Sequence, residues 1–102
     1  MTKTNIKIVF ANEAKADLRF IYERILEKTK SIVNATNVVT DILEASKKIH
    51  FVEQYQVDEF LGEPHRRIVV RHFKIIYKPV GNKEIRILQV FDTYQNPIKL
   101  RK

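Results

Sequence analysis

The chain has 102 residues, a formal net charge of +7 and no cysteine. This length suits one domain, and a composition that is 44% hydrophobic with two glycines and three prolines is that of a folded protein. Without cysteine there are no disulfides and no thiolate metal sites, and the short apolar run near the N-terminus is far below the length of a signal peptide or a membrane span. We therefore expect one soluble, cytoplasmic domain over residues 1–102, with no membrane association.

Positive charge is concentrated in the last third of the chain. Residues 65–102 contain ten Lys and Arg against two acids, whereas residues 1–64 contain nine against ten. A concentrated positive field attracts a polyanion or an acidic protein, and the charge is compatible with either partner.

The N-terminal half predicts a strand at residues 6–10 and then two helices. Asn12 could cap the first helix, and Ser31 could cap the second. The first apolar stripe consists of Ala14, Leu18, Ile21, Tyr22, Ile25 and Leu26. The second consists of Ala35, Val38, Val39, Ile42, Leu43, Ala45 and Ile49. The short connection between them predicts an antiparallel helical hairpin.

The C-terminal half predicts an antiparallel meander with strands at residues 66–71, 73–78 and 84–91, the last two joined at Gly81-Asn82. Residues 50–64 have no clear period, and Gly62 with Pro64 marks a turn there. The apolar residues expected to tuck under this segment are Tyr55, Val57, Phe60 and Leu61. The expected fold is α+β, a single β-α-α-β-β-β domain whose helical hairpin packs on one face of a small antiparallel sheet and leaves the other face open.

Residues alternate along the strand that begins at Phe73. Phe73, Ile75 and Tyr77 share one face, and Lys74 and Lys78 share the other. Because one set must face the helices, we expect the apolar set to lie in the core and the two lysines to lie on the open, basic face.

Two C-terminal motifs resemble a known signature. The run RRIVVRHFKIIYK at residues 66–78 is followed by ILQVFDTYQNP at residues 87–97. Together with the element order, these motifs resemble the RelE/ParE toxin superfamily, the toxin halves of bacterial type II toxin–antitoxin modules, which are often described as plasmid stabilisation proteins. The resemblance implies a RelE/ParE-like fold and an inhibitor of bacterial growth that a cognate acidic antitoxin holds inactive.

The superfamily divides by mechanism. RelE-like members cleave ribosome-bound mRNA, and ParE-like members poison DNA gyrase. The favoured interpretation is a RelE-like, metal-independent endoribonuclease (an mRNA interferase) that binds RNA and needs no cofactor. Such an enzyme needs a group that activates the ribose 2′-hydroxyl, cations for the phosphate and a proton donor. The alternatives are a non-enzymatic gyrase inhibitor and a degenerate member that only binds its antitoxin.

The resemblance points to two candidate catalytic residues. Arg71 matches a functional arginine of the RelE-like branch, and it could hold the scissile phosphate with bidentate hydrogen bonds or simply be a solvated strand-end arginine. Tyr94 stands where many relatives have an arginine before Gln-Asn-Pro, which puts nuclease activity in doubt. It could donate a proton or stack on a base, or it could be a half-buried aromatic that closes the sheet end. In the nuclease hypothesis Lys74 joins them around the phosphate.

The remaining candidates come from residue type. His72 could act as a general acid or base, although a solvated role is commoner at a tight turn. The three histidines lack metal-ligand spacing, so no metal site is proposed. Asp92 with Thr93 predicts a turn held by local hydrogen bonds rather than a catalytic acid. The candidate residues for binding RNA or a partner are Arg66, Arg67, Lys78 and Arg86.

Overall fold

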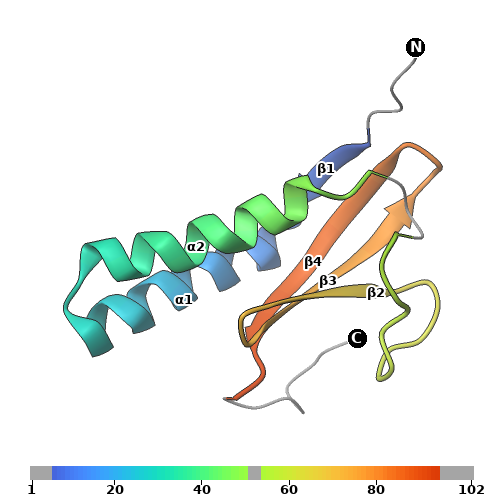
Figure 1. The fold of residues 1–102 in the computed structure, drawn as a ribbon. Coiled ribbons are helices and arrows are strands. Elements are labelled where there is room, and N and C mark those ends of the chain that lie inside the picture. Colours follow the sequence, from blue (N-terminus) through green and yellow to red (C-terminus); the bar gives the residue numbers. More distant parts are fainter. Residues whose placement is uncertain (1–5, 51–53, 95–102) are drawn as a thin grey trace.

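The computed structural model describes residues 6–50 and 54–94 (Figure 1). Its elements are β1 (Lys7–Phe10), α1 (Asn12–Thr29), α2 (Ile32–Lys47), β2 (Arg66–Val70), β3 (Phe73–Val80) and β4 (Glu84–Asp92). This is the predicted β-α-α-β-β-β order, and the α+β fold class is confirmed. Over the described ranges, no helix is both long enough and apolar enough to cross a membrane.

The four strands form one mixed sheet in the order β1-β4-β3-β2. The meander β2-β3-β4 is antiparallel as predicted, but β1 pairs with β4 in parallel, so the sheet is not antiparallel throughout. A parallel neighbour needs a crossover connection, and the helical hairpin forms the first part of that connection. Lys7 pairs with Glu84 and Phe10 with Ile87, so β1 covers only the first part of β4.

The N-terminal ends of the two helices differ in how they are capped. Ala11 is the N-cap of α1, and it is extended and makes no side-chain cap hydrogen bond, so the prediction that Asn12 caps this helix is wrong. The backbone N–H of Ala11 donates to the carbonyl of Ile87 at 2.9 Å, and this strand-like bond keeps Ala11 extended and starts the helix at Asn12. At α2, Oγ of Ser31 accepts from the backbone N–H of Asn34 at 3.0 Å, which confirms the predicted cap.

The two helices form the predicted antiparallel hairpin, visible side by side in Figure 1. Lys30 ends α1 in the left-handed conformation (φ 57°), and its N–H donates to the carbonyl of Leu26 at 2.7 Å. The backbone N–H of Ser31 then donates to Oγ1 of Thr29 at 3.2 Å. These bonds hold the short turn that reverses the chain.

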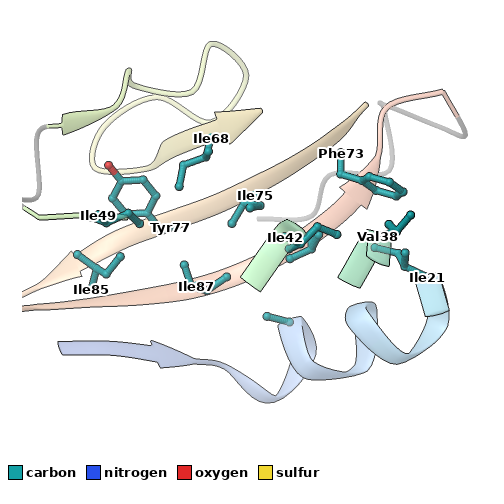
Figure 2. Packing of buried hydrophobic residues seen from close by; sticks show 12 residues of the cluster. Ile21, Val38, Ile42, Ile49, Ile68, Phe73, Ile75, Tyr77, Ile85 and Ile87 are labelled. Carbon is teal, nitrogen blue, oxygen red and sulfur yellow. The ribbon is translucent and has the colours of Figure 1, made fainter. Parts of the chain in front are cut away.

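The core lies between the helical hairpin and one face of the sheet. Figure 2 shows Ile21, Val38 and Ile42 of the helices facing the sheet. The sheet contributes Ile68, Phe73, Ile75, Tyr77, Ile85, Ile87 and Val90. The prediction that Phe73, Ile75 and Tyr77 lie in the core is confirmed, because each is at most 2% exposed. Each such side chain contributes roughly 1.5–3 kcal/mol when it is fully buried.

The other face of the sheet is partly covered by residues 54–65. Val57 forms a bridge with Arg66, and the N–H of Arg67 donates to the carbonyl of Gln56 at 3.0 Å, so this segment lies along the edge of β2. As a result Ile76, which points away from the helices, is 0% exposed. The expectation of a fully open face is therefore wrong.

The segment turns at Gly62 as predicted. Gly62 has a positive φ of 71°, its N–H donates to the carbonyl of Asp58 at 2.8 Å, and its carbonyl accepts from the N–H of His65 at 2.9 Å. Tyr55 packs against the core, with its ring edge-on to Tyr77. Phe60 remains 66% exposed, so the expectation that it tucks under the segment is wrong.

Candidate functional site

Arg71 and His72 form the two-residue turn between β2 and β3. Val70 pairs with Phe73, so β2 ends one residue before the predicted boundary. Of the two turn residues, only Arg71 has a positive φ, at 56°. Glycine usually occupies this first position in a turn of this kind, and another residue there carries strain of about 1–3 kcal/mol. The β2–β3 ladder on one side and the two hydrogen bonds from Thr93 to the His72 carbonyl on the other hold the turn in this conformation.

The guanidinium of Arg71 binds Asp41 of α2. Nε lies 2.8 Å and NH2 lies 2.7 Å from the same oxygen, Oδ2. Both side chains are nearly half exposed, at 45% and 47%, so water screens the pair and its stabilisation is about 0–1 kcal/mol. The ion pair connects the turn to α2, and breaking it costs little free energy. Arg71 lies at the predicted turn, and its catalytic role stays a prediction.

The imidazole of His72 binds Asp92, the last residue of β4. Nδ1 lies 2.7 Å from Oδ1, because Asp92 pairs in register with Phe73 beside the turn. The carbonyl of His72 accepts from both the N–H and the hydroxyl of Thr93, at 2.9 and 2.8 Å. In the neutral tautomer in which Nδ1–H donates to Oδ1 of Asp92, Nε2 keeps a lone pair. His72 is thus held by a carboxylate and not only by solvent.

The ring of Tyr94 stacks on the imidazole of His72. The ring centroids are 4.5 Å apart and the ring planes differ by 5°. The backbone N–H of Tyr94 donates to Oδ1 of Asp92 at 2.9 Å, which fixes the residue over the pair. His72 also stacks on the buried ring of Phe73, with centroids 4.4 Å apart. Tyr94 is 80% exposed, so the alternative of a half-buried aromatic is wrong, and its free face can stack on a base.

Lys74 lies on the predicted face of the sheet but is buried. Its ammonium is 2.9 Å from Oδ1 of Asp58 and 3.7 Å from Oε2 of Glu59. It also lies over the rings of Phe60 and Phe91, at 4.9 and 5.9 Å from their centroids. The expectation that Lys74 is exposed on a basic face is wrong, because residues 54–65 cover it. Its catalytic role stays a prediction.

Asp58 is fully buried and accepts several hydrogen bonds. Its Oδ2 accepts from the backbone N–H groups of Phe60 and Leu61, at 3.0 and 2.9 Å. Burial alone would raise the pKa of Asp58, but the hydrogen bonds from Lys74 and these two amides outweigh it and hold the pKa below its ordinary value of 3.8. Removing one partner of such a buried pair costs about 3–5 kcal/mol.

The four predicted partner-binding residues divide into two groups. Arg66 donates to the carbonyl of Tyr55 at 2.6 Å, and Arg67 donates to the carbonyl of Val57 at 2.9 Å, so both hold the segment that covers the sheet. Lys78 and Arg86 are paired in register at the far end of the sheet. NH2 of Arg86 is 3.5 Å from a carboxylate oxygen of Glu84, and the role of Lys78 and Arg86 in binding a partner stays a prediction.

The candidate site therefore consists of Arg71, His72, Asp92 and Tyr94, at the end of the sheet where β2 turns into β3. It contains a base or acid at Nε2 of His72, a cation at Arg71 and an exposed hydroxyl on a stacking ring. Sequence reasoning missed Asp92 as the partner of His72. In the described part of the chain, no cluster of three or more histidines and acids could hold a metal ion.

The structure of the chain is similar to known structures. No protein-family model matches the sequence, and no curated protein matches it. The structure is similar to a chain of the chromosomal ParDE toxin–antitoxin system from P. aeruginosa, with a TM-score of 0.71 and 21% identity, covering 88% of this chain and 98% of that one. It also matches a chain of the E. coli DinJ-YafQ complex at a TM-score of 0.45 and 14% identity, covering 90% and 98%. The TM-score of 0.71 shows that the chain has a ParE-like fold.

Proposed function

We propose that this chain is the toxin of a bacterial type II toxin–antitoxin module and that it inhibits growth. The ParE-like fold and the resemblance of the two C-terminal motifs to the superfamily signature support this proposal. An acidic antitoxin is the partner expected to hold it inactive. The cross-strand cations Lys78 and Arg86 would meet acidic side chains of such a partner.

The mechanism that the site geometry supports best is metal-independent cleavage of ribosome-bound mRNA. The observation that carries it is the 2.7 Å hydrogen bond between His72 and Asp92, which gives the candidate base His72 a carboxylate partner that the sequence alone did not reveal. Nε2 of His72 would take the proton of a ribose 2′-hydroxyl, whose oxygen then attacks the adjacent phosphorus. The bond from phosphorus to the 5′-oxygen breaks, leaving a 2′,3′-cyclic phosphate and a 5′-oxygen that takes up a proton to become a hydroxyl.

The other site residues have distinct tasks in this reaction. Arg71 would bind the non-bridging phosphate oxygens and stabilise the negative charge that builds up in the transition state. Tyr94 would stack on a base next to the cleaved bond, and its hydroxyl would supply the proton for the leaving oxygen. Asp92 keeps the imidazole in the tautomer that leaves Nε2 free.

A second candidate function is the inhibition of DNA gyrase by binding alone. It is favoured by the observation that both cations near the His72–Asp92 pair are matched by carboxylates of the same chain, Arg71 by Asp41 and Lys74 by Asp58. A surface whose cations are neutralised in this way suits a protein partner better than a phosphate. Exposed apolar residues of the hairpin, Phe20, Ile32 and Val33, would add contact area.

Pulse labelling after induction distinguishes these functions. Cells that express the chain without a partner should stop growing, and amino-acid incorporation should fall before thymidine incorporation. His72→Gln removes the base and should relieve the arrest, whereas His50→Gln, which changes an exposed histidine three residues after the end of α2, should not. An early loss of thymidine incorporation would support the gyrase mechanism, and normal growth with a folded wild-type chain would contradict the toxin function.

A further inference from the structure

We infer that Asp41 guards the phosphate-binding edge of Arg71, so that an RNA phosphate must displace the Asp41 carboxylate before the site is filled. This inference rests on the proposed nuclease function and adds to it a residue that sets how strongly the site binds RNA. Asp41 belongs to α2, and in the sequence it is far from the two motifs that carry the superfamily resemblance. The inference gives it a role at the β2–β3 turn.

The geometry places Asp41 and a phosphate in competition for the same atoms. The Nε and NH2 groups of Arg71 both point at Oδ2 of Asp41, at 2.8 and 2.7 Å. These two nitrogens form one edge of the planar guanidinium, and such an edge can bind phosphate oxygens with two parallel hydrogen bonds. While Asp41 occupies this edge, Arg71 offers little net charge to an anion.

Of the two cations near the His72–Asp92 pair, Arg71 is the one that can be released. Arg71 and Asp41 are both nearly half exposed, so water can solvate each partner as the pair separates. Lys74 and Asp58 are both buried, and the second oxygen of Asp58 is held by two backbone N–H groups. Separating that pair would leave buried charges unpaired, so Lys74 stays with Asp58.

Release of Arg71 requires no change in the turn. The carbonyl of His72 is bonded to both the backbone N–H and the hydroxyl of Thr93, and β2 and β3 continue the ladder on the other side. The exchange is therefore a movement of one long side chain. The guanidinium of Arg71, beside His72, would leave Asp41 only when an anion strong enough to compete with Asp41 is present.

The inference predicts that removal of the charge at Asp41 strengthens RNA binding. Asp41→Asn keeps a side-chain oxygen that can accept from Arg71 but removes the negative charge that competes with phosphate. The matched control is Glu27→Gln, which makes the same change in net charge at an exposed position near the end of α1 farthest from the sheet (Figure 1). The comparison separates the local effect from the general effect of a more basic protein.

The test is fluorescence anisotropy of the full chain with a fluorescein-labelled single-stranded RNA oligonucleotide, without ribosomes. Asp41→Asn should lower the Kd about two- to fivefold relative to Glu27→Gln, in keeping with the modest strength of an exposed ion pair. Between about 50 and 200 mM salt, the slope of log K against log salt should steepen by about 0.7, the value for one added phosphate contact on a single strand.

Arg71 must be the residue through which the effect acts. In an Arg71→Gln background, Asp41→Asn should change the Kd no more than Glu27→Gln does. The inference would be overturned if Asp41→Asn and Glu27→Gln had equal Kd values, or if neither variant bound RNA. It would also be overturned if the gain in affinity persisted without Arg71. If Asp41→Asn gains affinity through Arg71 but the chain cleaves no mRNA, the nuclease mechanism fails and the guard role of Asp41 stands.

Discussion

The ammonium group of Lys74 lies 2.9 Å from Oδ1 of Asp58, and both side chains are buried on the face of the sheet that does not contact the helices. Asp58 belongs to the segment that covers this face, and Lys74 is the second residue of β3. The pair therefore fastens the covering segment to the sheet, together with the rings of Phe60 and Phe91 that flank the ammonium.

Asp58→Ala should strongly destabilise the fold. It would leave the Lys74 ammonium buried without its closest partner, which costs about 3–5 kcal/mol in the free energy of unfolding. Glu59→Ala is the matched control, because Glu59 is exposed and lies 3.7 Å from the same ammonium, and it should cost less than about 1 kcal/mol. Urea unfolding followed by circular dichroism measures both, and equal losses would contradict a buried pair.

The alternation of residues on β3 predicts which side chains face the helices, but not what covers the other face. Phe73, Ile75 and Tyr77 could be assigned to the core because the period of two leaves only one apolar set. The burial of Lys74 could not be predicted in this way. It depends on the irregular segment 54–65, whose sequence has no period and whose position is set by hydrogen bonds to the edge of β2.

The partnership of His72 with Asp92 depends on a register shift within the sheet. Tyr77 pairs with Ile87 but Ile76 pairs with Gln89, so β4 contains one extra residue at this point. Regular pairing counted from the β3–β4 turn would place Phe91, not Asp92, opposite Phe73. No residue pattern in this sequence marks the bulge. The strands of the candidate site could therefore be predicted, but the contact between His72 and Asp92 could not.

Asp58 should also make the stability of the protein sensitive to acid. Burial alone would raise its pKa, but hydrogen bonds from Lys74 and two backbone amides lower it from 3.8. The folded state therefore holds this proton less tightly than the unfolded chain. The stability that Asp58 contributes is fully present above about pH 4 and is lost as the pH falls through the lowered pKa.

The test compares wild type with Asp58→Asn by urea unfolding at a series of pH values. The difference in unfolding free energy should be constant between about pH 5 and 7 and should shrink as the pH is lowered below about 4. Other carboxylates titrate in both proteins and cancel in the difference. A difference that does not change with acid would contradict the lowered pKa.

Arg71→Gly should separate the strain in the turn from the function of the side chain. Glycine accommodates the positive φ of 56° without a steric cost, so Arg71→Gly should be more stable than Arg71→Ala by about 1 kcal/mol. Both variants lose the bond to Asp41 equally. Both should relieve growth arrest, and the folded glycine variant shows that the relief is not caused by unfolding. Equal stability would contradict a strained turn.

Tyr94→Phe keeps the ring that stacks on His72 and removes only the hydroxyl. If that hydroxyl supplies a proton or a transition-state hydrogen bond, cleavage should slow by about ten- to a thousandfold. Tyr94→Leu also removes the stacking ring and should slow it further, whereas Tyr94→Arg should retain or raise activity. Primer extension on mRNA in a translation system gives the rates, and full activity of Tyr94→Phe would leave only the stacking role.

In the proposed mechanism His72, held by Asp92, is the base that starts the cleavage of mRNA. Asp92→Asn is the sharpest variant, because its amide oxygen can still accept from Nδ1 and from the backbone N–H of Tyr94, whereas the negative charge that stabilises the imidazolium formed during proton transfer is lost. His50 is exposed and lies three residues after the end of α2, so His50→Gln serves as the control.

The decisive measurement is primer extension on an mRNA in a purified translation system after addition of each protein. Wild type and His50→Gln should cut ribosome-bound mRNA and leave naked RNA largely intact. Cleavage by His72→Gln and Asp92→Asn should fall by about a hundredfold or more, as expected for the loss of a general base. Intact mRNA with the wild-type protein, or full cleavage by His72→Gln, would contradict the mechanism.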